Sequence, residues 1–276
     1  MKRIAIIAAL IGMIGSALPS AASAEDFLLA STTSTENSGL FAYLLPIFEA
    51  QSSIKTRVIA VGTGQALRLA RNGDADALLV HDPIAEKKFI ADGYGLDRRQ
   101  IMYNDFVLIG PKGDPAGIAK TKGILAALRT IAKTSAIFVS RGDDSGTHRA
   151  EQRHWAAAGV DAARGSGRWY REAGAGMGAA LNIASGINAY IIADRATWLS
   201  FRNKGTLRIL VERDPRLFNQ YGVIQVNPER HPHVNAKAAR AFSDWLSSPV
   251  GQKAIAKFRV GGKQLFFPNY GTRTGS

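Results

Sequence analysis

Short apolar runs alternate along the chain with amphipathic segments. Residues 27–30 form an apolar run that breaks into the hydroxyl-rich stretch 31–35, and apolar residues then recur at helical spacing over 40–48. The same order returns where the run 58–61 precedes Gly62-Thr63-Gly64 and a second amphipathic segment. Short runs bounded by turn residues predict buried strands, and the spaced segments predict helices. This alternation predicts an α/β fold with mainly parallel sheets flanked by helices.

The pattern continues to the C-terminal end of the chain. Further strands are expected at residues 77–80, 106–109, 136–139, 189–192, 207–211 and 221–226, and further helices at 124–132, from 179 onward, and at 236–246 and 250–258. No Pro-, Ser- or Gly-rich linker interrupts them, and no repeat of fixed period is present.

The length of the chain suits either two lobes or one large domain. Without a linker, two lobes must share the chain discontinuously. We expect residues 25–108 and 222–276 to form lobe 1 and residues 109–221 to form lobe 2. The extended stretches 106–110 and 222–226 would be the crossovers, and a single doubly wound domain is the alternative.

The first residues form a targeting pattern. Met1-Lys2-Arg3 is a short positive segment, an apolar run covers residues 4–18, and Ala22-Ser23-Ala24 has the small side chains of a cleavage site. A transmembrane anchor is the alternative, but the run is short for crossing a bilayer. We expect residues 1–24 to be a cleaved signal peptide, the mature chain to begin near Glu25, and the protein to be periplasmic.

Composition and charge narrow the function classes. The chain contains no cysteine, which excludes disulfides and thiolate metal sites. Its net charge of +13 is typical of nucleic-acid binding, but export argues against that partner and the basic residues are scattered, as at Arg68 and Arg71. We therefore expect a solvated basic surface that attracts anions, and no nucleic-acid partner.

Three loops share one arrangement, in which a buried strand ends, a Ser/Thr/Gly cluster follows and a helix begins. They cover residues 32–39, 62–65 and 141–147. The first N–H groups of a helix lack partners and its dipole favours negative charge, so such junctions bind anions. Ordinary helix capping is the alternative for any single loop, because Ser and Thr are the commonest caps.

The third loop adds a guanidinium to its hydroxyls. Arg141 offers paired donors to two oxygens of an oxyanion, and Ser145 and Thr147 could complete a cage made only of donors. Aspartate at a helix start is common, so we interpret Asp143 or Asp144 as orienting Arg141 and capping the following helix.

A serine hydrolase is the alternative from another function class. Asp144-Ser145-Gly146 is similar to the serine motif of trypsin-like proteases, and Asp82, His81 and His148 are conceivable partners. Those proteases are all-β, whereas this serine precedes a helix in an α/β pattern, and it is not central between its glycines as in a nucleophile elbow. We expect no catalytic residue.

Metal and nucleotide sites have weaker support. His148 and His154 are six residues apart, so on a helix they face different directions. The run Gly174-x-Gly176-x-Gly178 departs from the dinucleotide fingerprint. We expect no cofactor and no bound metal cation.

Several stretches in order match one known family, namely residues 31–40, 61–67, 73–76, 79–83, 102–107, 140–148, 176–178 and 181–182. Over nearly its whole mature length, the chain thereby resembles the periplasmic tungstate-binding proteins of the Tup type, which have the two-lobed type II periplasmic binding protein fold. One departure is that the family's run of three threonines appears here as Ser31-Thr32-Thr33.

The resemblance implies extracytoplasmic capture of tungstate in a cleft between lobes and delivery to the permease of an ABC importer. Molybdate, and then phosphate or sulfate, are the alternative ligands, and the protein would be a monomer. The resemblance also implies which residues line the anion site, although it leaves open which hydroxyl of 31–35 touches the ligand and what Asp82 does. These residues are Thr33, Ser34, Thr63, Arg141, Ser145, Gly146 and Thr147.

Overall fold

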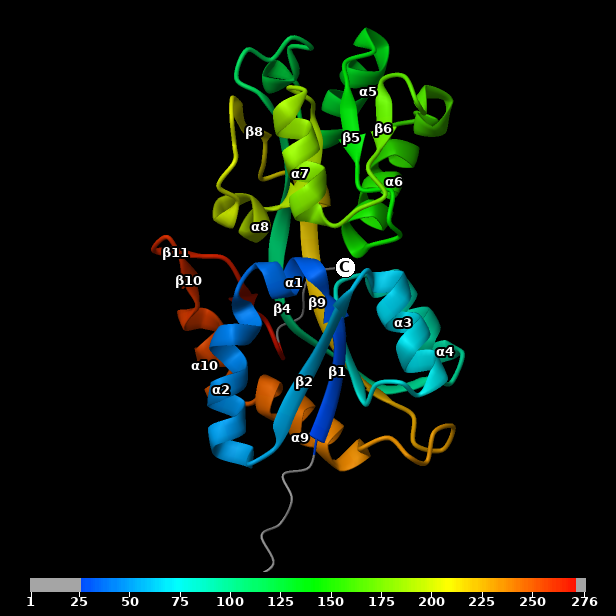
Figure 1. Cartoon of the computed structure of the whole chain (residues 1–276), viewed down its shortest axis with the longest axis vertical. Coiled ribbons are helices and arrows are strands. Elements are labelled where there is room, and N and C mark those ends of the chain that lie inside the picture. The colour runs from blue at the N-terminus through cyan, green and yellow to red at the C-terminus, as the bar shows by residue number, and fades with distance from the viewer. Residues whose placement is uncertain (1–25, 272–276) are drawn as a thin grey trace, which may run out of the picture.

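The computed structural model describes residues 26–271, and its central element is an eight-stranded mixed sheet (Figure 1). The predicted signal peptide, residues 1–24, lies outside the described residues. The main path of the sheet has the order β12-β4-β9-β3-β1-β2, and β7 and β8 pair with β4 beyond that path. The strands are β1 (Asp26–Thr32), β2 (Lys55–Val61), β3 (Ala77–Val80), β4 (Gly95–Pro111), β7 (Ile191–Asp194), β8 (Leu207–Val211), β9 (Phe218–Val226) and β12 (Phe267–Pro268).

Two small sheets and a set of helices complete the fold. The small sheets pair β5 with β6 and β10 with β11. These strands are β5 (Phe138–Ser140), β6 (Tyr170–Glu172), β10 (Arg259–Val260) and β11 (Lys263–Gln264), and the helices are α1 (Thr33–Asn37), α2 (Leu40–Ser52), α3 (Thr63–Asn72), α4 (Pro83–Ala91), α5 (Ile124–Thr134), α6 (Gly146–Ala157), α7 (Met177–Gly186), α8 (Arg195–Ser200), α9 (Ala236–Ser247) and α10 (Pro249–Lys257). Within the described part of the chain, no helix has the length and apolar character needed to cross a membrane.

Helices cover both faces of the strands. In the lower part of Figure 1, one hydrophobic cluster joins α2, α9 and α10 to the sheet, and a second joins α3 and α4 to its other face. In the upper part, α5 and α6 pack through one cluster and α7 and α8 through another. Strand β4 links the two parts, because Met102 belongs to a lower cluster whereas Phe106 and Val107 belong to the upper ones.

The predicted α/β class is confirmed, but the expectation of mainly parallel sheets was only partly right. Strand β1 is parallel to β2 and β3, and β5 is parallel to β6. Strands β4 and β9 are antiparallel to each other, and β9 is also antiparallel to β3. The physical reason is that β4 carries the chain from the lower part to the upper and β9 brings it back, so the two strands run in opposite directions.

Candidate anion-binding site

The three predicted loops and a fourth loop, which ends at Gly176, bring the starts of α1, α3, α6 and α7 together. The backbone N–H of Gly64 in α3 donates to the carbonyl oxygen of Asp144, at 3.2 Å, in the loop before α6. The Arg141 side chain from that same loop reaches Ser34 in α1. A Cβ placed on Gly176, the residue before α7, would lie 4.0 Å from the Thr33 hydroxyl oxygen. Helix N-termini that converge in this way favour bound negative charge.

Arg141 is the central cation of this junction and is only 1% exposed. Its Nη1 donates to Ser34 Oγ at 3.1 Å, and its Nη2 donates to Thr33 Oγ1 at 3.4 Å. On the other edge, Nε and Nη2 both donate to Asp143 Oδ2, at 3.2 and 2.5 Å. The expectation that an aspartate orients Arg141 is therefore confirmed for Asp143, whose Oδ1 also accepts from the N–H of Ser145.

The hydroxyls of the first loop divide into two groups. Ser31 donates to the carbonyl oxygen of Leu79, and the Thr32 and Thr35 hydroxyls bond to each other at 2.8 Å. Thr32 is also the N-cap of α1. These three hydroxyls bond to each other or to the neighbouring strand β3, whereas those of Thr33 and Ser34 face the guanidinium of Arg141.

Two further predicted site residues are buried hydroxyls whose oxygens have no hydrogen-bond partner in the described structure. They are Thr63 Oγ1 at the start of α3 and Thr147 Oγ1 in the first turn of α6. A Cβ on Gly146 would lie 2.8 Å from Thr63 Oγ1 and 2.7 Å from the His81 ring, so only glycine allows this approach. Because buried polar atoms are nearly always paired, these two hydroxyls are candidates for contact with a ligand.

Ser145 has the position of a helix cap. Its side chain is the N-cap of α6, with Oγ accepting from the N–H of His148 at 3.2 Å. The interpretation of an aspartate as the cap of this helix was therefore wrong. Since the serine oxygen is the acceptor in this bond, its O–H remains available as a donor.

The environment of His81 and Asp82 contradicts the protease alternative. His81 Nδ1 bonds to Asn219 Oδ1 at 3.0 Å, and burial lowers the pKa of its ring to about 4, so the ring is neutral at pH 7. Asp82 pairs with Arg149 and Arg153. The hydrogen bonds and ion pairs of these residues therefore do not assemble a Ser–His–Asp relay around Ser145.

A second buried carboxylate lies near the guanidinium. Asp194, at the end of β7, caps α8 through Oδ1, while its Oδ2 is buried without a partner in the described structure. Burial raises the pKa of Asp194, and the positive charge of Arg141 opposes that rise. Sequence reasoning missed Asp194, because an aspartate after a strand has the pattern of an ordinary cap.

Sequence reasoning also missed the glycine before α7 and the cations behind the loop. In the sequence, Gly176 belongs to the dinucleotide-like run and to the stretch 176–178 that resembles the Tup type, but neither pattern places it beside Thr33. Arg149 and Arg153 are one helical turn apart, a common spacing on exposed helix faces, so nothing in the sequence pairs them with Asp82.

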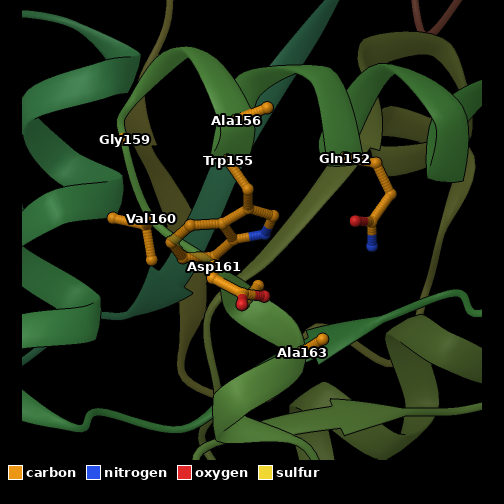
Figure 2. Close-up of a pocket in the computed structure, with 8 residues that line it drawn as sticks. Gln152, Trp155, Ala156, Gly159, Val160, Asp161 and Ala163 are labelled. Atoms are coloured by element: carbon orange, nitrogen blue, oxygen red, sulfur yellow. The ribbon is translucent and has the colours of Figure 1, made fainter.

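A pocket of a different kind lies at the opposite end of α6 (Figure 2). Trp155, Ala156 and Val160 form much of its wall, and its carboxylate, Asp161, is exposed and pairs with Arg164. Its lining does not suit an oxyanion. Among residues 26–271, no group of three or more His, Asp or Glu side chains could hold a metal ion.

Known proteins are similar to this chain in sequence and in fold. A model of the PBP superfamily domain matches residues 19–250. The tungstate-binding protein TupA of Peptoclostridium acidaminophilum is 46% identical over 246 residues, which cover 88% of this chain and 85% of that protein.

Solved structures agree with this relation. The tungstate-binding protein TupA from Desulfovibrio alaskensis G20 has a TM-score of 0.76 and 44% identity, covering 90% of this chain and 100% of that one. The tungstate ABC transporter structure from Geobacter sulfurreducens has a TM-score of 0.77 and 47% identity, covering 85% of this chain and 99% of that one. The chain therefore has the type II periplasmic binding protein fold and belongs to the PBP superfamily and, within it, to the TupA family of ABC-transporter substrate-binding proteins.

Proposed function

We propose that this protein binds tungstate outside the cytoplasm and delivers it to the permease of an ABC importer. The relation to the TupA proteins supports this function. The single observation that carries it is the buried Arg141, whose guanidinium lies among hydroxyls at a junction of helix N-termini. The protein is a binding protein and not an enzyme, so no bond is made or broken.

The site has the donors that a fully deprotonated dianion needs. We propose that Arg141, the hydroxyls of Thr33, Ser34, Thr63, Ser145 and Thr147, and the N–H of Gly146 donate to the oxygens of the anion. The loop has two carboxylates, and both already accept hydrogen bonds: Asp143 from Arg141 and the N–H of Ser145, and Asp144 from Arg149. Both carboxylates of the loop are thus engaged by arginines, so a fully deprotonated dianion such as tungstate or molybdate, which needs only donors, suits the loop better than phosphate, which retains a proton near neutral pH.

We also propose that the chain moves as two lobes that close around the anion. Lobe 1 would comprise residues 25–108 and 222–276, and lobe 2 residues 109–221, with β4 and β9 as the crossovers. The bond from Gly64 to Asp144 and the bond from Arg141 to Ser34 would then exist only in the closed form. Closure around a ligand by a hinge follows when the ligand contacts both lobes. The mature protein would be periplasmic and monomeric.

A thermal-shift panel of tungstate, molybdate, sulfate and phosphate tests the proposed ligand. A ligand at about a thousandfold above its dissociation constant stabilises the fold by about 4 kcal/mol. We expect a large upward shift in melting temperature with tungstate, a smaller or similar one with molybdate and little with the others. Because saturation hides a difference in affinity, tungstate and molybdate must also compete at limiting concentration. A larger shift with sulfate or phosphate than with tungstate would contradict the assignment of tungstate as the ligand. No shift with any of the four anions would contradict the proposal that the protein has an oxyanion site.

A further inference from the structure

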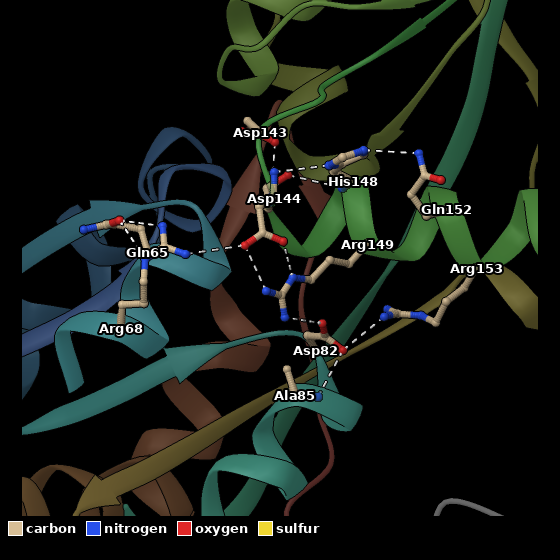
Figure 3. A network of polar contacts seen from close by, with 11 residues as sticks. Gln65, Arg68, Asp82, Ala85, Asp143, Asp144, His148, Arg149, Gln152 and Arg153 are labelled. Atoms are coloured by element: carbon tan, nitrogen blue, oxygen red, sulfur yellow. Dashed lines mark hydrogen bonds and ion pairs between the residues drawn. The ribbon is translucent and has the colours of Figure 1, made fainter. Parts of the chain in front are cut away.

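A cluster of charged side chains bridges the two sides of the site, and none of its members is a predicted anion ligand (Figure 3). We call it the bridging cluster. One side provides Arg68 of α3 and Asp82 at the start of α4, and the other provides Asp144, Arg149 and Arg153 from the loop before α6 and from α6 itself.

Arg149 is the member that joins the two carboxylates. Its Nε and Nη2 donate to the two oxygens of Asp144, at 2.7 and 2.9 Å, which is the bidentate geometry. Its Nη1 lies 3.5 Å from Asp82 Oδ2 on the opposite side. The Asp82 side chain is only 2% exposed, whereas that of Arg149 is 29% exposed.

Asp144 lies against the start of α3, with its side chain 51% exposed. Its backbone has φ 57°, in the left-handed region that non-glycine residues rarely adopt. A Cβ on Gly64 would lie 1.8 Å from Asp144 Oδ2, so the carboxylate occupies space that only a glycine leaves free. The loop that carries Ser145 and Gly146 is therefore held against α3 by both backbone and side chain.

We propose that Arg149 is a positioning residue that holds the closed form through Asp82 and Asp144, and that it thereby sets how tightly tungstate is retained. This inference rests on the proposed function. Arg149 would not touch the anion. Its partner Asp144 directly precedes Ser145, so the ion pairs connect the anion loop to the start of α4 on the other side.

Because Asp82 is buried, the loss of Arg149 should weaken ligand binding. In the closed form Asp82 is shielded from water and depends on Arg149 and Arg153 for compensation. In an open form these arginines move away and water hydrates the carboxylate. Removing Arg149 therefore destabilises the closed form more than the open one, and the loss appears in ligand affinity.

The experiment compares tungstate dissociation constants of the full-length mature protein and its variants, measured by displacement calorimetry against molybdate. We expect Arg149→Gln and Asp82→Asn each to raise the dissociation constant about tenfold, which lies between the small effect of an exposed ion pair and the larger effect of a fully buried one. Asn at position 82 keeps an oxygen for the N–H of Ala85, which Asp82 now caps. The matched control is Arg164→Gln, which removes an arginine whose side chain is 86% exposed and pairs with Asp161.

The double variant and the melting temperatures separate positioning from a general structural role. We expect the double variant, with both Arg149→Gln and Asp82→Asn, to bind tungstate about as weakly as the weaker-binding single variant, because both changes break the same ion pair. We expect Arg149→Lys to lose less than Arg149→Gln, and the ligand-free melting temperature to be the same in Arg149→Gln and the control. Unchanged dissociation constants, or a fall in ligand-free melting temperature alone, would overturn the proposal. Failure of the wild type to bind tungstate would instead contradict the proposed function.

Discussion

Asp143 Oδ2 accepts two hydrogen bonds from one edge of the Arg141 guanidinium, at 3.2 and 2.5 Å. The opposite nitrogen, Nη1, is thereby directed at Ser34. A carboxylate that holds one edge of a planar guanidinium fixes the direction of the remaining donors. The selectivity of the site should therefore depend on the geometry of the Arg141–Asp143 pair as well as on the positive charge of Arg141.

Substitution of Arg141 tests that dependence. We expect Arg141→Ala to lose roughly 2 to 5 kcal/mol of tungstate binding free energy, the range for truncating one partner of a buried charge pair. Arg141→Lys keeps the charge but not the paired geometry, so it should weaken binding and reduce discrimination among oxyanions. Calorimetric titration with tungstate, molybdate and sulfate measures both effects. An unchanged affinity in Arg141→Ala would exclude this residue from the site.

Removing the unpartnered hydroxyls should weaken tungstate binding without lowering the stability of the ligand-free protein. Thr63→Val and Thr147→Val keep the side-chain shape and remove an oxygen that has no hydrogen-bond partner in the described structure. We expect each variant to weaken tungstate binding by about 1 to 2 kcal/mol, while the ligand-free protein keeps or gains stability. Titration calorimetry and ligand-free thermal melts measure the two quantities. Equal binding by both variants and the wild type would contradict their assignment as ligand donors.

Ser145→Ala should weaken tungstate binding and also lower the stability of the ligand-free protein. The variant removes the N-cap of α6, which costs about 1 kcal/mol of ligand-free stability, and it removes one proposed donor, which costs about 1 to 2 kcal/mol of binding. Urea denaturation and calorimetry measure the two losses. The same variant examines the hydrolase alternative, because labelling of Ser145 by a fluorophosphonate probe, with ester turnover lost in Ser145→Ala, would favour a nucleophilic serine.

Glu151 predicts a pH dependence of stability. It lies fully buried in α6 and accepts from Tyr170 and Trp155, and burial raises the pKa of its carboxyl to about 8. A carboxyl whose pKa is higher in the folded than in the unfolded protein stabilises the fold fully below pH about 4.5. This stabilisation is lost as the pH rises toward 8. The contribution of Glu151 to the free energy of unfolding should therefore fall over this range, while His81 and His154, whose pKa values burial lowers to about 4, contribute in the opposite direction.

The variant Glu151→Gln should flatten this pH dependence, because glutamine keeps the acceptor and does not ionise. Urea denaturation of the ligand-free protein at several pH values measures the slope. A residual slope is expected from Glu86, whose pKa burial raises to about 7. The control is Glu229→Gln, a change at an exposed position. An equal slope in the wild type and Glu151→Gln would contradict the prediction.

The parts of the fold and site that could be predicted from sequence are those that local pattern encodes. Strand–loop–helix junctions are contiguous in sequence, so the loops around Thr33, Thr63 and Arg141 can be predicted from local pattern alone. Strand β4 was expected only at residues 106–109, because the charged residues at its start, including Asp97 and Arg98, obscured an edge-like stretch that pairs with β9. The ion pairs of Asp82 depend on how two distant segments pack, and no local pattern contains that information.

The position of β9 in the sheet also determines how the protein can fold. β9 lies between β3 and β4, although it follows β4 by more than a hundred residues of chain. The first three strands can pair with one another early, but the free edge of β3 and the facing edge of β4 must wait for residues 218–226. A nascent chain or fragment that ends before Phe218 therefore presents two unpaired strand edges, which favour pairing between molecules. Completion of the sheet that carries the first anion loops is consequently a late, long-range event in folding.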